Sequence, residues 1–271
     1  MSVLSRNPSR VRVGSGIPWD GRNQGAWTKE LDDADAVINL AGENVGEGRW
    51  TADRKRKLIA SRIEATGAIV EALRSAPQRT RTLVSASAVG YYGDRGDEVL
   101  DESASQGEGF LATLVETWES AAVKAEPFAR AVLLRFGVAL AAEGGALKKM
   151  LLPFKLGAGG PMGSGRQWMS WIDRDDALRM VLWALDNAEV RGLYNATAPE
   201  PVRNSDFTRA LGQALHRPAV LPAPAFALRL AFGQMADEML LGGQRVIPRR
   251  AEAEGFAFES RTIEQAFAKH L

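Results

Sequence analysis

The sequence predicts an α/β fold with a doubly wound parallel sheet, followed by a smaller C-terminal α+β lobe. Apolar runs at 36–42, 82–87 and 131–138 read as buried strands, and helical segments separate them. Over 51–73, apolar residues recur at spacings of three and four. Repeated strand–helix units with fully apolar strands are typical of a parallel sheet that helices cover on both faces. After about residue 140 the elements become shorter and less regular.

The first element is a short strand over 1–6, which ends in Ser5-Arg6 before an Asn7-Pro8 turn. In nucleotide-binding α/β folds a strand of this kind is usually the second, so the first strand and its helix are missing from the sequence. Thr51 is a suitable N-cap for the helix over 51–73. A helix over 109–125 separates the second and third apolar strands.

The remaining elements define the domain organisation that we expect. A short strand at 168–172, a helix at 173–187 and a strand at 194–197 precede helices at 205–215 and 224–241. We assign 1–140 to the core, to which 168–198 also contributes, and most of 141–271 to the second lobe. Residues 220–271 form a small C-terminal domain within that lobe.

Composition excludes several classes of function. The 271 residues carry 34 basic and 33 acidic side chains, so no global field attracts nucleic acid or a membrane surface. No apolar run approaches the ~20 residues that a membrane span needs, and the N-terminus has no signal-peptide pattern. Cysteine is absent and only two histidines are present, so we predict no disulfide and no metal site. A cytoplasmic protein is the default expectation.

Three charged segments invite functional interpretations. Ser5 and Arg6 follow a strand at the place where a 2′-phosphate would need a guanidinium, although Arg6 could equally be an exposed turn residue. Arg62 lies beside the apolar stripe of its helix, where a half-buried arginine needs an anion. That anion is either a carboxylate, such as Glu43 or Glu64, or a cofactor phosphate. We interpret Arg54 to Lys57 as a solvated helix face.

Several blocks of the sequence resemble one family. They are Asn39 to Asn44 with Arg49-Trp50, Ser87 to Gly93, Trp118-Glu119, Leu134 to Val138, Pro153-Phe154 with Gly165 to Trp168, and Gly242 to Pro248. Together they resemble the atypical "epimerase family" branch of the extended short-chain dehydrogenases/reductases, whose members carry a C-terminal domain of unknown function. The resemblance spans essentially the whole chain.

The resemblance implies a Rossmann-like core that binds NADP(H), with a small substrate held between core and lobe; nucleotide sugars are one candidate class. Ser5, Arg6, Leu40, Ala41, Gly42 and Arg62 fall on cofactor-binding positions. Ser85 or Ser87 falls in the catalytic hydroxyl region, with Tyr91 or Tyr92 as the candidate substitute for the family's tyrosine, and Arg166, Gln167 and Trp168 fall on the substrate side.

Two departures from the family pattern leave the function open. No Tyr-x-x-x-Lys motif exists in the sequence, and Phe110 and Leu114 occupy its two slots. Tyrosine supplies the proton in that motif and lysine adjusts its pKa, which phenylalanine and leucine cannot do. The strand and glycine-rich turn that begin the family fold are also missing, through a misassigned start, a shortened chain or natural variation. Without that strand, neighbouring strands would keep unpaired edges or pair with each other, and a homo-oligomer becomes possible.

Three functions remain compatible with the sequence. The first is an NADP(H)-dependent epimerase- or oxidoreductase-like enzyme. The second is a non-catalytic NADP(H)-binding regulatory or partner-binding protein. The third is a shortened chain that no longer binds a dinucleotide.

Overall fold

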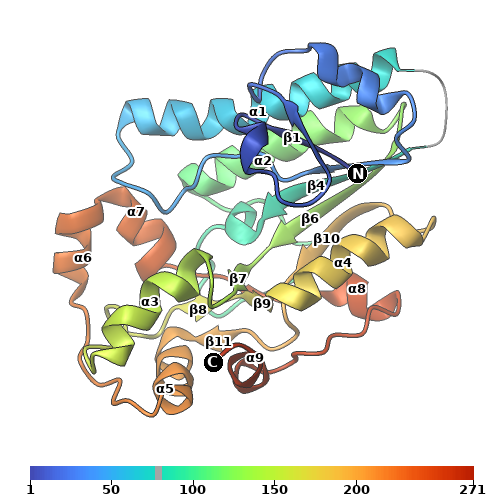
Figure 1. Cartoon of the computed structure of the whole chain (residues 1–271). Coiled ribbons are helices and arrows are strands. Elements are labelled where there is room, and N and C mark those ends of the chain that lie inside the picture. Colours follow the sequence, from blue (N-terminus) through green and yellow to red (C-terminus); the bar gives the residue numbers. More distant parts are fainter. Residues whose placement is uncertain (77–80) are drawn as a thin grey trace.

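A computed structural model describes residues 1–76 and 81–271 (Figure 1). The strands are β1 (Ser2–Ser5), β2 (Ser15–Pro18), β3 (Ala36–Asn39), β4 (Thr82–Ala88), β5 (Val99–Leu100), β6 (Arg130–Phe136), β7 (Val138–Leu140), β8 (Trp168–Met169), β9 (Trp171–Asp173), β10 (Gly192–Ala196), β11 (Val202–Arg203) and β12 (Arg245–Val246). The α-helices are α1 (Ala52–Ser75), α2 (Phe110–Ala122), α3 (Gly145–Lys155), α4 (Arg174–Asp186), α5 (Asn204–Ala214), α6 (Ala225–Phe232), α7 (Gln234–Ala236), α8 (Arg249–Ala253) and α9 (Ile263–His270). The short 3-10 helices are η1 (Pro8–Arg10), η2 (Ala26–Leu31), η3 (Val89–Tyr92) and η4 (Val123–Ala125), and η5 (Asp237–Leu241) is a π-helix.

The main sheet has four parallel strands in the order β10-β6-β4-β3. Helices α1 and α2 pack together on one face (Figure 1), and α4 packs on the other against an apolar layer that includes Val84, Val132 and Met180. Helices on both faces of a parallel sheet confirm the predicted doubly wound α/β fold.

Strand β3 departs from the expectation of a fully buried strand. In the described part of the chain it pairs only with β4, so it lies at the edge of the sheet, and Ile38 is 46% exposed. Strands β1 and β2 pair with each other in parallel and form a separate two-stranded sheet. The apolar run predicted the strand correctly, but it does not show whether the strand pairs with a neighbouring strand along both of its edges.

The second lobe contains a separate apolar core, in which α3, α5 and α9 bury Leu147, Phe207 and Phe267 together with Trp171. The strand expected at 168–172 is two strands: β8 pairs with β11, and β9 pairs with β7. The helix expected at 224–241 is also divided. Gly233 adopts a φ of +61°, a left-handed conformation that ends α6 and separates it from α7.

None of the helices in the described ranges combines the length and apolar character that crossing a bilayer requires.

Candidate functional site

A row of polar side chains crosses the α1/α2 face of the sheet near the carboxyl ends of its strands. The row contains Asn39 on β3, Ser85 and Ser87 on β4, Arg135 on β6 and Asn195 on β10. Asn39 pairs with Ser85, Ser87 with Arg135, and Arg135 with Asn195, so the strand register aligns them on one face. All five are buried. Ligands of open α/β sheets bind at this edge.

Ser87 belongs to a buried charged network. Arg135 donates two hydrogen bonds to Glu119 of α2, from Nε to Oε1 and from Nη2 to Oε2, both at 2.7 Å. The hydroxyl of Ser87 donates to the same carboxylate. Burial lowers the pKa of the Arg135 guanidinium, but the hydrogen bond to Glu119 and the neighbouring Tyr92 more than offset this, and the pKa is raised. The bidentate contact fixes Arg135 as a cation.

Arg135 lies against both tyrosines of η3 (Val89–Tyr92). Its guanidinium carbon is 3.4 Å from the centre of the Tyr91 ring and 4.8 Å from that of Tyr92. Tyr92 is fully buried and donates a hydrogen bond of 2.7 Å to Asn195 Oδ1. Burial raises the pKa of Tyr92 to about 12. The cation therefore fixes the orientation of the Tyr91 ring above it.

The four predicted catalytic hydroxyls differ in their accessibility. Ser85 is fully buried and accepts a hydrogen bond of 3.3 Å from Asn39 Nδ2. The hydroxyls of Ser87 and Tyr92 donate to Glu119 and Asn195. Tyr91 is only partly buried, and among residues 1–76 and 81–271 its hydroxyl makes no hydrogen bond to another side chain. Of these four residues, Tyr91 is the one that is not fully buried.

The two slots of the absent Tyr-x-x-x-Lys motif lie in an apolar cluster. Leu114 is 2% exposed and packs with Trp50, Leu58 and Met235, and Phe110 packs against this cluster. The ring of Phe110 meets that of Trp50 at 5.1 Å between centres. Met235 comes from α7 in the C-terminal part, so this cluster joins the second lobe to the core. The two positions that the motif would occupy therefore carry apolar side chains, Phe110 and Leu114, which pack against Met235 of the C-terminal part.

Arg62 lies beneath the loop that leaves β3. A Cβ placed on Gly42 would lie 3.0 Å from Arg62 Cζ, so glycine permits the close approach of this loop to the guanidinium. Arg62 Nη1 donates to the Leu58 carbonyl at 3.1 Å, and the guanidinium stacks over Trp118 at 5.0 Å. Among the described residues no carboxylate lies within ion-pair distance of it, and Glu64 pairs with Arg22 instead. Burial lowers the pKa of Arg62 to about 10.

Leu40 and Ala41 continue β3 at the same edge. Leu40 is 65% exposed, and the backbone N–H of Ala41 donates to Asn39 Oδ1 at 3.1 Å. The loop is fixed further on, where the Glu43 N–H donates to Ser61 Oγ at 3.0 Å. Gly42 thus lies next to Arg62, and Leu40 and Ala41 precede it in the same loop; their assignment to the cofactor side stays a prediction.

Arg6 reaches this site from the separate β1–β2 sheet. Its Nη1 is 3.4 Å from Glu43 Oε1, and its side chain is 76% exposed. Ser5 Oγ accepts a hydrogen bond of 3.0 Å from the Asn7 N–H, which orders the turn after β1. Arg6 also lines a cavity of about 520 Å³, together with Trp19 and Trp27. Ser5, Arg6 and Glu43 therefore bring β1 and the end of β3 to one edge.

The predicted substrate-side residues lie around Trp168. Its indole N–H donates to Asp97 Oδ1 at 2.8 Å, and the guanidinium groups of Arg203 and Arg245 lie 4.2 and 4.5 Å from its ring centre. Asp97 belongs to the loop that follows η3, which links this cluster to the polar row. The other two predicted residues, Arg166 and Gln167, differ from each other in exposure and in hydrogen bonding.

Arg166 is exposed, whereas the Gln167 amide donates to the carbonyls of Met162 and Leu240 at 3.0 and 2.6 Å. Gln167 therefore joins two loops of the lobe. Arg166 remains accessible from solvent.

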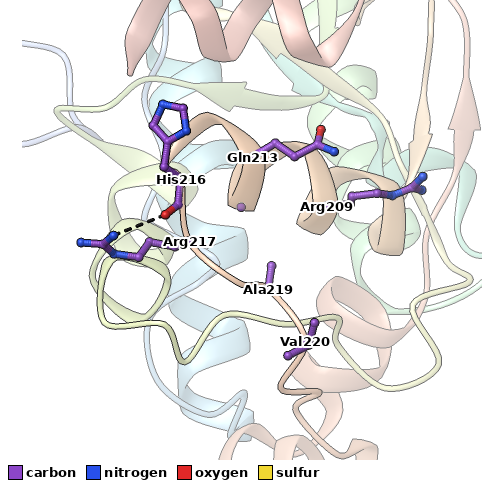
Figure 2. Close-up of a pocket in the computed structure, with 7 residues that line it drawn as sticks. Arg209, Gln213, His216, Arg217, Ala219 and Val220 are labelled. Carbon is purple, nitrogen blue, oxygen red and sulfur yellow. Dashed lines mark hydrogen bonds between the residues drawn. The ribbon is translucent and has the colours of Figure 1, made fainter.

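A second cavity, of about 570 Å³, lies at the end of α5 and contains none of the predicted site residues (Figure 2). Arg209, Gln213, His216, Arg217 and Val220 are among its lining residues. Arg217 bonds to the carbonyl oxygens of Lys155 and His216, which ties α3 to this segment.

Sequence reasoning missed three residues of the site. Arg54 was placed on a solvated face, but its side chain is 20% exposed and its Nη1 is 3.3 Å from Glu43 Oε2. Glu119 and Arg135 were noticed only as parts of family blocks. A signal existed for the latter two, because a charge inside an apolar strand or helix face needs an opposite charge nearby.

Comparisons with known proteins agree with this architecture. The model of the NAD dependent epimerase/dehydratase family matches residues 3–196, and that of a domain of unknown function, DUF1731, matches 223–269. An epimerase family protein of Mycobacterium leprae is 40% identical over 99% of this chain and 86% of its own. Human epimerase family protein SDR39U1 is 37% identical over 95% of this chain and 86% of its own.

Solved structures show the same fold. The crystal structure of human SDR39U1 (isoform 2) with NADPH superposes with a TM-score of 0.91 at 35% identity, over 99% of this chain and 90% of that one. A UDP-glucuronic acid 4-epimerase from Bacillus cereus, at 15% identity and a TM-score of 0.72, shares the fold alone. By its sequence and its structure, the chain belongs to the NAD dependent epimerase/dehydratase family.

Proposed function

We propose that this chain binds NADP(H) at the carboxyl edge of its sheet and acts as an epimerase- or oxidoreductase-like enzyme on a small substrate. The observation that carries the proposal is Arg62, a half-buried guanidinium beside Gly42 with no carboxylate within ion-pair distance in the described chain. A buried charge without a partner is costly, so an anionic ligand at this position would stabilise the protein. The NADPH in the human SDR39U1 structure supports the identity of that ligand.

The residues at this edge fit a phosphorylated dinucleotide. Arg6 and Arg62 supply guanidinium groups, and Ser5 supplies a hydroxyl at the end of β1. Leu40 and Ala41 supply an exposed apolar surface on which an adenine could lie. An arginine at the end of β1, where NAD-preferring proteins hold a ribose hydroxyl with an acid, favours NADP(H) over NAD(H).

The nicotinamide supplies hydride exchange when it is bound. For that chemistry the chain offers the Tyr91 hydroxyl, held above Arg135, as the group that contacts a substrate oxygen. Ser87 acts indirectly, because its hydroxyl is committed to Glu119. We place the substrate on the side of residues 141–271, near Arg166 and Trp168. Nucleotide sugars are one candidate class.

A second function has its own supporting observation. Phe110 and Leu114 lie in the apolar cluster that docks α7, so the chemistry of Tyr-x-x-x-Lys is replaced by packing. An NADP(H)-binding protein without turnover, which regulates or binds a partner, would need this rigid connection between core and lobe but no proton donor.

Titration of the chain with NADPH and NADH, followed by tryptophan fluorescence, tests the proposal. Trp118 stacks on Arg62 and serves as the internal probe. We expect saturable quenching by NADPH and weaker binding of NADH. Oxidation of bound NADPH by a panel of carbonyl substrates, lost in Tyr91→Phe but with binding retained, would support the enzyme. Binding without turnover would support the second function, and no binding would refute both.

A further inference from the structure

Three arginines lie around one carboxylate, Glu43, at the proposed cofactor site, and two of them contact it. Arg6 and Arg54 contact the two oxygens of Glu43 at 3.4 and 3.3 Å, and Arg62 lies next to the same loop. Burial has the largest effect on the pKa of Arg62 and lowers it. The negative charge of Glu43 raises this pKa and the positive charge of Arg54 lowers it further, so the three charges act on one another. No other carboxylate in the described ranges lies within ion-pair distance of these arginines. Two positive charges are therefore uncompensated.

Arg54 is the least expected member of this cluster. Its Nη2 donates to the Asn44 carbonyl at 2.6 Å, and its Nη1 donates to Glu43. Its Nε is buried and has no hydrogen-bond partner within the described residues. An unpaired buried N–H costs free energy, so an acceptor beside this atom would be favoured.

Two other basic residues of the same helix turn, Arg56 and Lys57, do not share these properties. Arg56 and Lys57 are exposed and pair with Asp53 on the surface. Lys55 also has no carboxylate partner among the described residues, but its Nζ donates to Gln234 Oε1 at 2.5 Å and lies over the Phe110 ring. Arg54 therefore differs from each of its basic neighbours, because it alone among them contacts Glu43 and keeps a buried N–H without a partner in the described structure.

We propose that Arg54, held in place by Glu43, binds a phosphate group of the dinucleotide together with Arg6 and Arg62. This inference rests on the proposed function. A phosphate with two negative charges would balance the two uncompensated arginines, and its oxygens accept hydrogen bonds from guanidinium groups in the geometry that arginine favours. Glu43 is a positioning residue, because it separates the guanidinium groups and orients them without contacting the ligand.

The test compares Arg54→Ala with Arg56→Ala, two arginines separated by half a helical turn. Dissociation constants for NADPH and NADH are measured by calorimetry or by tryptophan fluorescence. Loss of one hydrogen-bonded charge should weaken NADPH binding about ten- to hundred-fold in Arg54→Ala. Arg56→Ala should bind as the wild type does. A loss seen only with NADPH assigns Arg54 to the 2′-phosphate, and an equal loss with both ligands assigns it to the pyrophosphate.

Arg54→Lys guards against a folding defect. It keeps the charge and the aliphatic stem but loses the planar fork, so affinity between those of the wild type and Arg54→Ala supports the inference. Wild-type affinity for NADPH in a folded Arg54→Ala variant would overturn it and leave the proposed function intact. Failure of the wild type to bind NADPH would overturn the proposed function and this inference together.

Discussion

Removal of the Glu119 carboxylate should unfold the protein at a much lower temperature. Glu119→Ala leaves the Arg135 guanidinium, whose side chain is 4% exposed, without its two 2.7 Å hydrogen bonds. One nitrogen of Arg135, Nη1, already lacks a partner in the described structure. Breaking a buried ion pair by removing one partner costs about 3–5 kcal/mol. For a chain of this size that loss lowers Tm by about 6–20 °C, measured by circular dichroism.

A matched control separates burial from geometry. Glu98 accepts a similar two-pronged contact from Arg95 at 2.9 and 2.8 Å, but its side chain is 49% exposed. Glu98→Ala should therefore cost about 1 kcal/mol or less. The double variant Glu119→Leu with Arg135→Met should recover much of the lost stability, because no charge stays buried alone. Equal Tm shifts for Glu119→Ala and Glu98→Ala would refute the reasoning.

Three further predictions concern stability. Burial raises the pKa of Tyr92 to about 12, so the folded state favours the neutral phenol. In urea unfolding, the stability advantage of wild type over Tyr92→Phe should be full below pH ~10 and should shrink as the pH rises toward 12. A difference that stays constant with pH would contradict this. Glu238 accepts hydrogen bonds from the backbone N–H groups of Phe110 and Leu111 and so caps α2. Glu238→Ala should lower the free energy of unfolding by about 0.5–2 kcal/mol, and Asp237→Ala by less. Equal losses for the two variants in denaturant titrations would argue against this cap. Asp173 caps α4 and its carboxylate faces Lys269 and His270. Tm should therefore fall from wild type to Asp173→Asn, which keeps a capping oxygen, and further to Asp173→Ala, which keeps none. Any other order would contradict the role of Asp173 as both cap and ion-pair partner.

Local sequence patterns predicted most elements of the core. The three- and four-residue spacing over 51–73 corresponds to α1, and Thr51 caps it by accepting a hydrogen bond from the Arg54 N–H. The apolar run at 82–87 corresponds to β4, and most of the run at 131–138 corresponds to β6, at the centre of the sheet. The end of the second run was wrong, because β6 stops at Phe136 and Val138 begins β7, which pairs with β9 in a separate sheet. These elements are regular because one face of each helix and both faces of each strand are buried, and this burial determines the periodicity.

Predictions failed where tertiary contacts determine the outcome. Helix α3 was not anticipated, because it contains Pro153 and begins at the pair Gly144-Gly145, in which Gly144 is the N-cap and Gly145 the first helical residue. Its place is determined by Leu147 and Phe154, which pack into the lobe's core. The strand at 168–172 divides because Trp168 and Trp171 join different sheets. None of these pairings leaves a mark in the local sequence.

The positions of the strand ends were predictable from the sequence, whereas the contacts of their side chains were not. Residues at the ends of strands, such as Arg6 and Gly42, could be assigned from the fold alone, because strand ends meet at one edge of a parallel sheet. The commitment of Ser87 to Glu119 could not, since the two lie 32 positions apart and meet only through packing of α2 on β4. The contact of Arg54 with Glu43 was likewise not apparent within a run of four basic residues.

A crystal structure of the chain grown with NADP⁺ tests the central claim most directly. We expect the dinucleotide along the carboxyl edge of the sheet, with phosphate oxygens within hydrogen-bond distance of Arg6 or Arg62 and the adenine over Leu40. A dinucleotide bound elsewhere, with Arg62 still lacking an anionic neighbour, would contradict the account.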